Sequence, residues 1–320
     1  MPYELYCEDC LRWLADQPEA SIQAIVTDPP YGLKEYTSKE QAKLRNGNHG
    51  GVWRIPPSLG GSTRAPLPRF TVLTPQETLD LYKFFLRWGR ATLRVAAPGA
   101  HLFIATNPLL SHILYRALAR AGWEKRGEVV RLVQTLRGGD RPKNAEAEFP
   151  DVSVMPRSAW EPWGLFRRPL DGRVQDNLRR WGTGGLRRIS DEQPFADVIP
   201  SERTPARERA IINHPSLKPQ RFMRQVVRAS LPLGAGRVLD PFAGGGSTIA
   251  AAEAVGYDSV GVEFDPHYYN LAVAAIPQLA ALYQDDGTTE QRERVGEGII
   301  ALERAAAILQ PGLFVDAQNS

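Results

Sequence analysis

Short apolar runs alternate with longer amphipathic stretches along most of the chain, and each kind predicts its own element. We expect strands over residues 4–9, 21–28, 98–106, 127–135, 237–240 and 258–265. We expect helices over residues 10–17, 74–96, 111–123, 219–232, 248–256 and 266–276, and one more after residue 290. Thr74, Pro75 and Glu77 form a capping-box start for the longest helix. This alternation predicts an α/β fold with a twisted, mostly parallel sheet and helices on both faces.

Two basic stretches interrupt the pattern. Residues 34–70 hold seven Lys and Arg against two Asp and Glu, and residues 121–190 hold fourteen against nine. Residues 241–320 hold three against eleven, although the whole chain has a net charge of only +3. Basic regions with interleaved aromatic residues are typical of surfaces that bind a polyanion, and solvated loops are the simpler alternative.

These interruptions suggest how the chain is organised. We expect one domain in two halves, residues 1–134 and 213–320. The irregular residues 135–212 would be an inserted region between the halves, rich in Arg, Pro, Gly and Trp. Residues 34–70 would form a basic flap, because so long a connection without periodicity is usually functional.

Length and composition exclude several classes of protein. With 320 residues, 42% of them hydrophobic, the chain can bury a large core. No apolar run approaches ~20 residues, so we expect no membrane contact. The first ten residues lack a basic, apolar leader, so a cytoplasmic enzyme is expected. Cys7 and Cys10 form a lone CxxC, for which a local structural role is favoured over a metal site or a redox pair.

The motif VTDPPYG, at residues 26–32, stands at the end of a predicted strand. Two consecutive prolines cannot continue a sheet, because each fixes φ and lacks an N–H. A turn with a capping aspartate is the simple interpretation. The alternative is a preorganised site made of the Asp28 carboxylate, the rigid backbone of Pro29 and Pro30, and the aromatic face of Tyr31.

A glycine-rich loop in VLDPFAGGGST, at residues 238–248, lies between a predicted strand and a predicted helix. It is not a P-loop, because no Lys follows the glycines, and it does not fit GxGxxG. Glu263 follows Gly244 by 19 residues, the distance at which an acid accepts hydrogen bonds from ribose hydroxyls. The pattern suits a nucleoside without phosphates, such as S-adenosylmethionine, and a glycine turn with an incidental Glu is the alternative.

Two further charged residues fit such a ligand. Lys218 precedes a helix that we expect to begin at Pro219, and a cation with free helix N–H groups suits a carboxylate. A plain helix cap explains the same residues equally well. Asp9 follows the first predicted strand, where it could accept a hydrogen bond from an adenine amine.

With DPPY before DPFAGGGST, the chain resembles the β group of the DNA amino-methyltransferases, which methylate adenine N6 or cytosine N4. HPSLKPQRFM just before the glycine loop, the opening segment at residues 5–32 and the stretch at 160–186 are also similar to that family. The resemblance spans residues 3–34, 71–134 and 157–276. Gly245 departs mildly from the Ser or Thr that the family often has between its glycines.

The resemblance implies a Rossmann-like methyltransferase fold, S-adenosyl-L-methionine as the cofactor and double-stranded DNA as the substrate. Residues 135–212 would be the DNA target-recognition region. A cognate restriction endonuclease and a second copy of the chain are candidate partners. The expected setting is prokaryotic or phage-like cytoplasm, at the nucleoid, in a restriction–modification system.

The resemblance also assigns roles residue by residue. The catalytic residues would be Asp28, Pro29, Pro30 and Tyr31. The cofactor would contact Asp9, Cys10, Asp28, Ser216, Lys218, Asp240, Pro241, Phe242, Ala243, Gly244, Gly246, Ser247, Thr248 and Glu263. DNA would contact Lys34, Arg45, Trp53, Arg54, Arg64, Arg69, Arg141 and Lys143.

The chemistry of DPPY then follows. If the Asp28 carboxylate and the Pro29 carbonyl accept the two N–H hydrogens of an exocyclic amine, its lone pair localises on nitrogen and can attack a sulfonium methyl. Tyr31 offers a face on which a flipped base can stack. The leaving group is neutral, so we expect no metal.

Three alternatives stay open. Asp28 favours adenine N6, but cytosine N4 presents a similar amine to the same loop. A methyltransferase for RNA or for protein glutamine would more often have Asn at position 28. A nucleic-acid-binding module without activity would be expected to lose Asp28, Tyr31 or Glu263, and all three are present.

Overall fold

The computed structural model describes residues 3–30, 58–59, 62–63, 73–133, 139, 141–142, 144–212, 214 and 216–283. Met1–Ala280 form one compact unit. The helix predicted after residue 290 and nearly all of the basic flap lie outside the described residues. Among the helices that are described, none is long and apolar enough to cross a membrane.

Strands and helices alternate along most of this unit. The strands are β1 (Tyr3–Cys7), β2 (Ile22–Thr27), β3 (Ser58–Leu59), β4 (Ser62–Thr63), β5 (Ala96–Ala105), β6 (Glu124–Leu132), β7 (Trp160–Arg167), β8 (Val198–Pro200), β9 (Arg237–Asp240) and β10 (Asp258–Glu263). The helices are α1 (Cys10–Asp16), α3 (Pro75–Val95), α4 (Ser111–Ala121), α5 (Val174–Trp181), α6 (Ala206–Ile211), α7 (Gln220–Ser230), α8 (Ser247–Ala254) and α9 (Pro266–Ala281).

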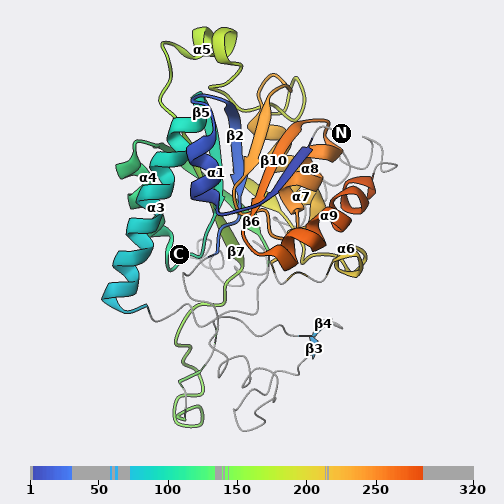
Figure 1. The fold of residues 1–320 in the computed structure, drawn as a ribbon. Helices are drawn as coiled ribbons and strands as arrows, with labels where there is room; N and C mark the ends of the chain where they lie inside the picture. Colours follow the sequence, from blue (N-terminus) through green and yellow to red (C-terminus); the bar gives the residue numbers. More distant parts are fainter. Residues whose placement is uncertain are drawn as a thin grey trace, which may run out of the picture. The chain divides into compact units, whose positions relative to one another are not determined.

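Eight strands form one twisted sheet in the order β1-β10-β9-β2-β5-β7-β6-β8 (Figure 1). Neighbouring strands in this order are parallel, except that β7 is antiparallel to both β5 and β6. β2 and β9 are therefore neighbouring interior strands, and their carboxyl ends lie at the same edge of the sheet as those of β5, β6 and β10.

Helices cover both faces of the sheet. On one face, α1, α3 and α4 bury their apolar sides, with Trp13, Trp88 and Leu118 at most 3% exposed. On the other face, α7 and α8 pack on the sheet through a second cluster that includes Phe222 and Ala251. The predicted α/β fold with a mostly parallel sheet and helices on both faces is confirmed.

Local signals determine several helix boundaries. The predicted capping box is present, since Thr74 Oγ1 accepts from Glu77 N–H and the Glu77 side chain accepts from Thr74 N–H. α7 begins one residue later than predicted, with Pro219 as its N-cap and Gln220 as its first residue. The strand predicted at 127–135 begins earlier, at Glu124, and ends at Leu132.

The stretch 135–212 is less irregular than its sequence predicts. It contains α5, α6, β7 and β8, and both strands belong to the main sheet. β7 buries residues from both of its faces, so its sequence WEPWGLFR lacks the alternation that marks a half-buried strand. Within the basic flap, only the backbone of a short antiparallel hairpin, β3 with β4, is described.

Candidate active site

Asp28, Pro29 and Pro30 directly follow β2 at the carboxyl edge of the sheet. On the neighbouring strand, Asp240 ends β9, and Thr27 Oγ1 donates a hydrogen bond of 2.7 Å to Asp240 Oδ1. This bond ties the last residues of the two central strands together. Ligands of open α/β sheets bind in the crevice outside this edge. Tyr31, the remaining residue of the motif, lies outside the described residues.

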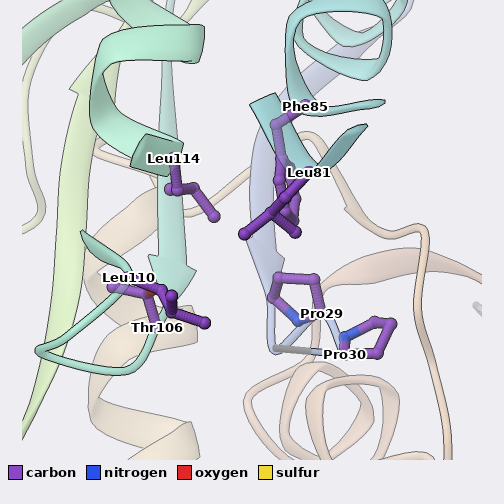
Figure 2. A pocket seen from close by; sticks show the side chains of 7 residues that line it. All are labelled: Pro29, Pro30, Leu81, Phe85, Thr106, Leu110 and Leu114. Atoms are coloured by element: carbon purple, nitrogen blue, oxygen red, sulfur yellow. The ribbon is translucent and has the colours of Figure 1, made fainter. Parts of the chain in front are cut away.

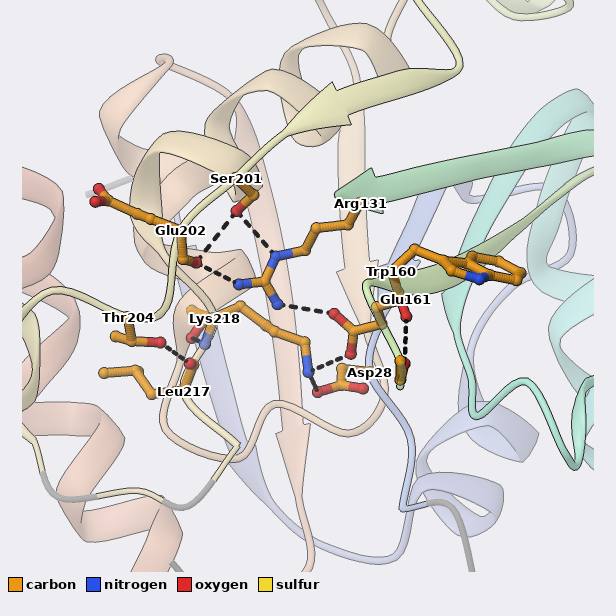
Figure 3. A network of polar contacts seen from close by, with 11 residues as sticks. Asp28, Arg131, Trp160, Glu161, Ser201, Glu202, Thr204, Leu217 and Lys218 are labelled. Atoms are coloured by element: carbon orange, nitrogen blue, oxygen red, sulfur yellow. Dashed lines mark hydrogen bonds and ion pairs between the residues drawn. The ribbon is translucent and has the colours of Figure 1, made fainter. Parts of the chain in front are cut away.

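A chain of four charged side chains begins at Asp28 (Figure 3). Lys218 Nζ lies 2.5 Å from Asp28 Oδ2 and 3.1 Å from Glu161 Oε1. The second oxygen of Glu161 lies 2.8 Å from Arg131 Nη1. These side chains are between 8% and 16% exposed, so the network is largely removed from water.

The carboxylates and cations of this network stabilise one another in their charged forms. Burial alone would lower the pKa of Lys218, but the carboxylates of Asp28 and Glu161 outweigh it and raise that pKa. Burial alone would raise the pKa of Glu161, but Lys218 and Arg131 outweigh it and hold that pKa well below its usual range. Two carboxylates therefore face two cations, and Asp28 sits beside a fixed positive charge.

Lys218, which its sequence context predicts as a partner for a ligand carboxylate, also has carboxylate partners within the protein. Its ammonium contacts the protein's own carboxylates Asp28 and Glu161. The N–H of Gln220, at the start of α7, donates to both oxygens of the buried Glu208 carboxylate. The ammonium and the first N–H of α7 thus both have carboxylate partners within the protein, and contact of Lys218 with the cofactor stays a prediction. The backbone N–H of Lys218 donates to Ser247 Oγ at 3.2 Å, which places this segment beside the glycine loop.

The glycine loop connects β9 to α8 and needs left-handed backbone at Gly244 (φ 50°) and Gly246 (φ 80°). Asp240 Oδ1 accepts from Phe242 N–H at 3.1 Å as the loop begins. Burial raises the pKa of Asp240 to about 6. The Glu263 carboxylate reaches into the same loop, where its Oε2 accepts from Gly244 N–H at 2.7 Å. The predicted pairing of this loop with the acid at the next strand end is therefore present.

Glu263 and Asp9 lie on adjacent strand ends. Cys7 pairs with Glu263 in the sheet, and Glu8 N–H donates to the Glu263 carbonyl at 3.0 Å. Asp9 caps α1, because its Oδ1 accepts from the N–H groups of Leu11 and Arg12, both at 3.0 Å. The structure thus brings Asp9, Glu263 and the glycine loop to one edge.

The remaining cofactor candidates divide into core and loop residues. Cys10 is buried in the α1 core, and burial raises the pKa of its thiol to about 12, so it is not a reactive thiolate. The Phe242 ring lies 5.7 Å from the Trp88 ring and anchors the loop on α3. Ser216 N–H donates to His214 Nδ1 at 3.2 Å. Pro241, Ala243, Ser247 and Thr248 lie on the loop and the first turn of α8.

A small cavity lies behind the DPP segment, between it, α3 and the start of α4 (Figure 2). Its lining is apolar apart from one hydroxyl and consists of Pro29, Pro30, Leu81, Phe85, Thr106, Leu110 and Leu114. The two prolines thus border a small apolar cavity that offers few groups to a substrate.

Only one of the predicted DNA-contacting residues belongs to the part of the chain that the structure describes. That residue is Arg141, which is exposed. Outside the described residues lie Lys34, Arg45, Trp53, Arg54, Arg64, Arg69 and Lys143. Their role stays a prediction.

The sequence motifs missed three residues at the site. Glu161 and Arg131 complete the network around Lys218, and an acid between two tryptophans in WEPW was the available signal for Glu161. His214 packs edge-on to Tyr268 with ring centres 4.6 Å apart and borders Gly244 and Gly245. Burial, together with Lys218, lowers the pKa of His214 to about 4, so it is neutral at pH 7.

Comparison with known proteins indicates a family that fits this geometry. A family model described as DNA methylase, of the N6/N4 type, matches residues 146–274. The family model and two curated relatives support a DNA amino-methyltransferase of the adenine-N6 and cytosine-N4 family. This methyltransferase is 22% identical over 303 residues to the type II methyltransferase M.HindIII of Haemophilus influenzae, covering 84% of this chain and 93% of that protein. It is 26% identical over 289 residues to M.XycI of Xanthomonas campestris pv. cyanopsidis, covering 84% and 85%.

Solved structures share the fold of this methyltransferase. A protein of Thermus thermophilus, provisionally described as a DNA modification methylase and crystallised with S-adenosyl-L-methionine, superposes with a TM-score of 0.55 at 19% identity. The alignment covers 88% of this chain and 95% of that one. The cytosine-N4-specific PvuII DNA methyltransferase also gives a TM-score of 0.55, at 12% identity, covering 88% and 92%.

Proposed function

We propose that this methyltransferase transfers a methyl group from S-adenosyl-L-methionine to the N6 amine of adenine in double-stranded DNA. The observation that carries the proposal is the position of Asp28. Its carboxylate follows β2 at the carboxyl edge, two prolines hold the backbone after it, and Lys218 lies 2.5 Å from one of its oxygens. Cytosine N4 is the alternative target, because both bases present an exocyclic amine.

The residues of the glycine-loop edge fit the cofactor. Each oxygen of Glu263 accepts one backbone N–H, from Gly244 and from Asp265, and a carboxylate oxygen can accept a second bond from a ribose hydroxyl. Both cap bonds of Asp9 go to Oδ1, so the carboxylate keeps capacity for an adenine amine. When bound, the cofactor supplies an electrophilic methyl group on a sulfonium.

The chain's own residues prepare the nucleophile. An amine is weakly nucleophilic while its lone pair is delocalised into the base. Asp28 and the Pro29 carbonyl would accept its two N–H hydrogens and localise that lone pair, with little reorganisation because the prolines are rigid. With the cofactor bound, the nitrogen would gain its bond to the methyl group as the sulfur–methyl bond breaks, and it would shed one proton towards Asp28 or water. Tyr31 would stack on the flipped base.

Partners and setting follow from the family relation. The two relatives are named type II methyltransferases, so a restriction–modification system with a cognate endonuclease is the proposed context. A homodimer and the use of residues 135–212 for DNA target recognition remain proposals of the same kind.

The test is methylation of genomic DNA from a host that lacks its own DNA methylation. Purified protein is incubated with this DNA and labelled S-adenosyl-L-methionine, and the product is digested to nucleosides. We expect N6-methyladenine, and none with Asp28→Ala as the control. N4-methylcytosine without N6-methyladenine would overturn the adenine assignment, and absence of transfer to DNA would overturn the proposal.

A further inference from the structure

The buried charge chain continues beyond Lys218, away from Asp28 (Figure 3). Glu161 uses its two oxygens separately, Oε1 for Lys218 and Oε2 for Arg131. Arg131 is 6% exposed as a residue and donates from Nε to Ser201 Oγ at 3.0 Å and from Nη2 to the Glu202 carbonyl at 2.8 Å. Arg131 and Glu161 are therefore held on several sides. Through Lys218, they connect Asp28 to the segment after β8.

The backbone supports the same arrangement. Arg131 and Glu161 are register partners in the antiparallel pair of β6 and β7. The Arg131 guanidinium also lies 5.3 Å from the centre of the Phe222 ring on α7, the helix that follows Lys218. Side chains that are locked by packing and hydrogen bonds lose little freedom when they orient a neighbour, which is how supporting residues keep a site within its productive geometry.

We propose that Glu161 and Arg131 are positioning residues for methyl transfer, which hold the Lys218 ammonium so that it fixes the direction and the charge of the Asp28 carboxylate. This inference rests on the methyltransferase activity, and it is the same for either base. Asp28 can localise an amine lone pair only from one direction, and a displacement of about 1 Å can cost on the order of 10² in rate.

Glu161 also sets how much of the Lys218 charge falls on Asp28. With both carboxylates present, the ammonium divides its hydrogen bonds between them. Without the Glu161 charge, Lys218 would interact more strongly with Asp28 and draw more electron density from it. A carboxylate held in this way accepts hydrogen bonds from a substrate amine less well. Loss of Glu161 should therefore lower kcat rather than the affinity for cofactor or DNA.

The chain offers a matched control on the same two strands. Glu124 and Arg167 are also register partners of β6 and β7, and Glu124 Oε2 lies 2.7 Å from Arg167 Nη2. This pair lies at the opposite end of the two strands from Arg131 and Glu161. Glu124→Gln thus removes the same charge from the same kind of cross-strand pair, without touching the Lys218 network.

The experiment compares Glu161→Gln with Glu124→Gln and wild type, by methyl groups transferred per enzyme to methylation-free genomic DNA at saturating cofactor. We expect Glu161→Gln to lower kcat by about 10- to 100-fold, with the Kd for S-adenosyl-L-methionine and the KM for DNA within about threefold. Glu124→Gln should stay within about threefold in all three. Because total methyl groups are counted, a cytosine product would overturn the adenine assignment without affecting this inference.

Two further variants keep the proposal testable if Glu161→Gln does not fold. Glu161→Asp keeps the charge and should lose less activity than Glu161→Gln. Arg131→Lys keeps the cation but loses the guanidinium bonds to Ser201 and Glu202, and should lower kcat by about three- to tenfold. A Glu161→Gln kcat within threefold of that of Glu124→Gln would overturn the proposal. So would a loss confined to cofactor affinity, or, if Glu161→Gln does not fold, an unchanged kcat in Arg131→Lys.

Discussion

Gly246 offers a direct test of how tightly the glycine loop is packed. Its φ is 80°, and a Cβ built there would lie 2.5 Å from Ile276 Cγ1 and 2.9 Å from Ile276 Cδ1. Ile276 is fully buried in α9, so it has little room to move. Gly246→Ala therefore faces two costs, left-handed backbone with a side chain and a clash with the core.

The two costs can be estimated separately. Left-handed backbone costs an L-residue about 1–2 kcal/mol, and overpacking a well-packed core costs about 1–3 kcal/mol. Gly256 has nearly the same φ, 76°, but a Cβ there would meet no atom within 4 Å. We expect Gly256→Ala to lower the free energy of unfolding by about 1–2 kcal/mol, and Gly246→Ala by about 2–5 kcal/mol.

Urea unfolding of the two variants measures this difference. A double-mutant cycle with Ile276→Ala then isolates the clash, because the smaller side chain makes room for the new methyl group. We expect the two substitutions to compensate each other by about 1–3 kcal/mol. Equal losses in Gly246→Ala and Gly256→Ala, or a coupling near zero, would refute the packing argument.

Three further outcomes are expected at the site. Asp28→Ala should lower kcat by about 10²–10³ or more while the protein stays folded. Methyl transfer measures kcat, and circular dichroism checks the fold. Turnover within a few-fold of wild type would contradict the catalytic role of Asp28. Glu263→Ala should weaken S-adenosyl-L-methionine binding by about 1.5–3 kcal/mol, measured by calorimetry, with DNA affinity little changed. Burial raises the pKa of Asp240 from 3.8 to about 6, so folding favours the protonated carboxyl. The contribution of Asp240 to stability therefore falls as pH rises between these two values and is level above them. Asp240→Asn should remove this dependence, so the free energy of unfolding of the variant, relative to that of wild type, should rise from pH 4 to pH 6.5. A constant difference would show that Asp240 does not titrate there.

The elements with strong local signals could be predicted from the sequence. Thr74 and Glu77 cap α3 as expected, and the double proline after Asp28 marks the end of β2. Because parallel strands end at one edge, the placement of Asp28, the glycine loop and Glu263 together also followed from the order of elements.

The partners of Lys218 could not be predicted in the same way. Lys218 and Asp28 are 190 residues apart in the chain, and nothing local to NHPSLKPQ distinguishes a cation for a ligand from a cation for a buried carboxylate. The N-terminus of α7 misled for a related reason, since its first N–H is bonded to Glu208 on α6. Tertiary contacts decided both cases.

The antiparallel direction of β7 within the eight-stranded sheet explains why the sequence motifs did not reveal Glu161. In a parallel sheet the residues of a site come from strand ends, so Asp28 after β2, Asp240 at the end of β9 and Glu263 at the end of β10 are natural candidates. β7 runs the other way, and therefore brings its beginning to the same edge. Glu161, its second residue, thus meets Arg131, next to last in β6.

The same reversal gives β6 and β7 two Arg–Glu pairs, one at each end of the strand pair. The pair at the beginning of β7, Glu161 with Arg131, faces the site, while the pair at its end, Arg167 with Glu124, lies at the far edge of the sheet. The two pairs join the same residue types across the same two strands, so comparing them tests whether the position of the pair matters, although Glu124 is more exposed than Glu161. If the network around Lys218 serves methyl transfer, only the pair at the carboxyl edge should control kcat, and the pair at the amino edge should affect stability alone.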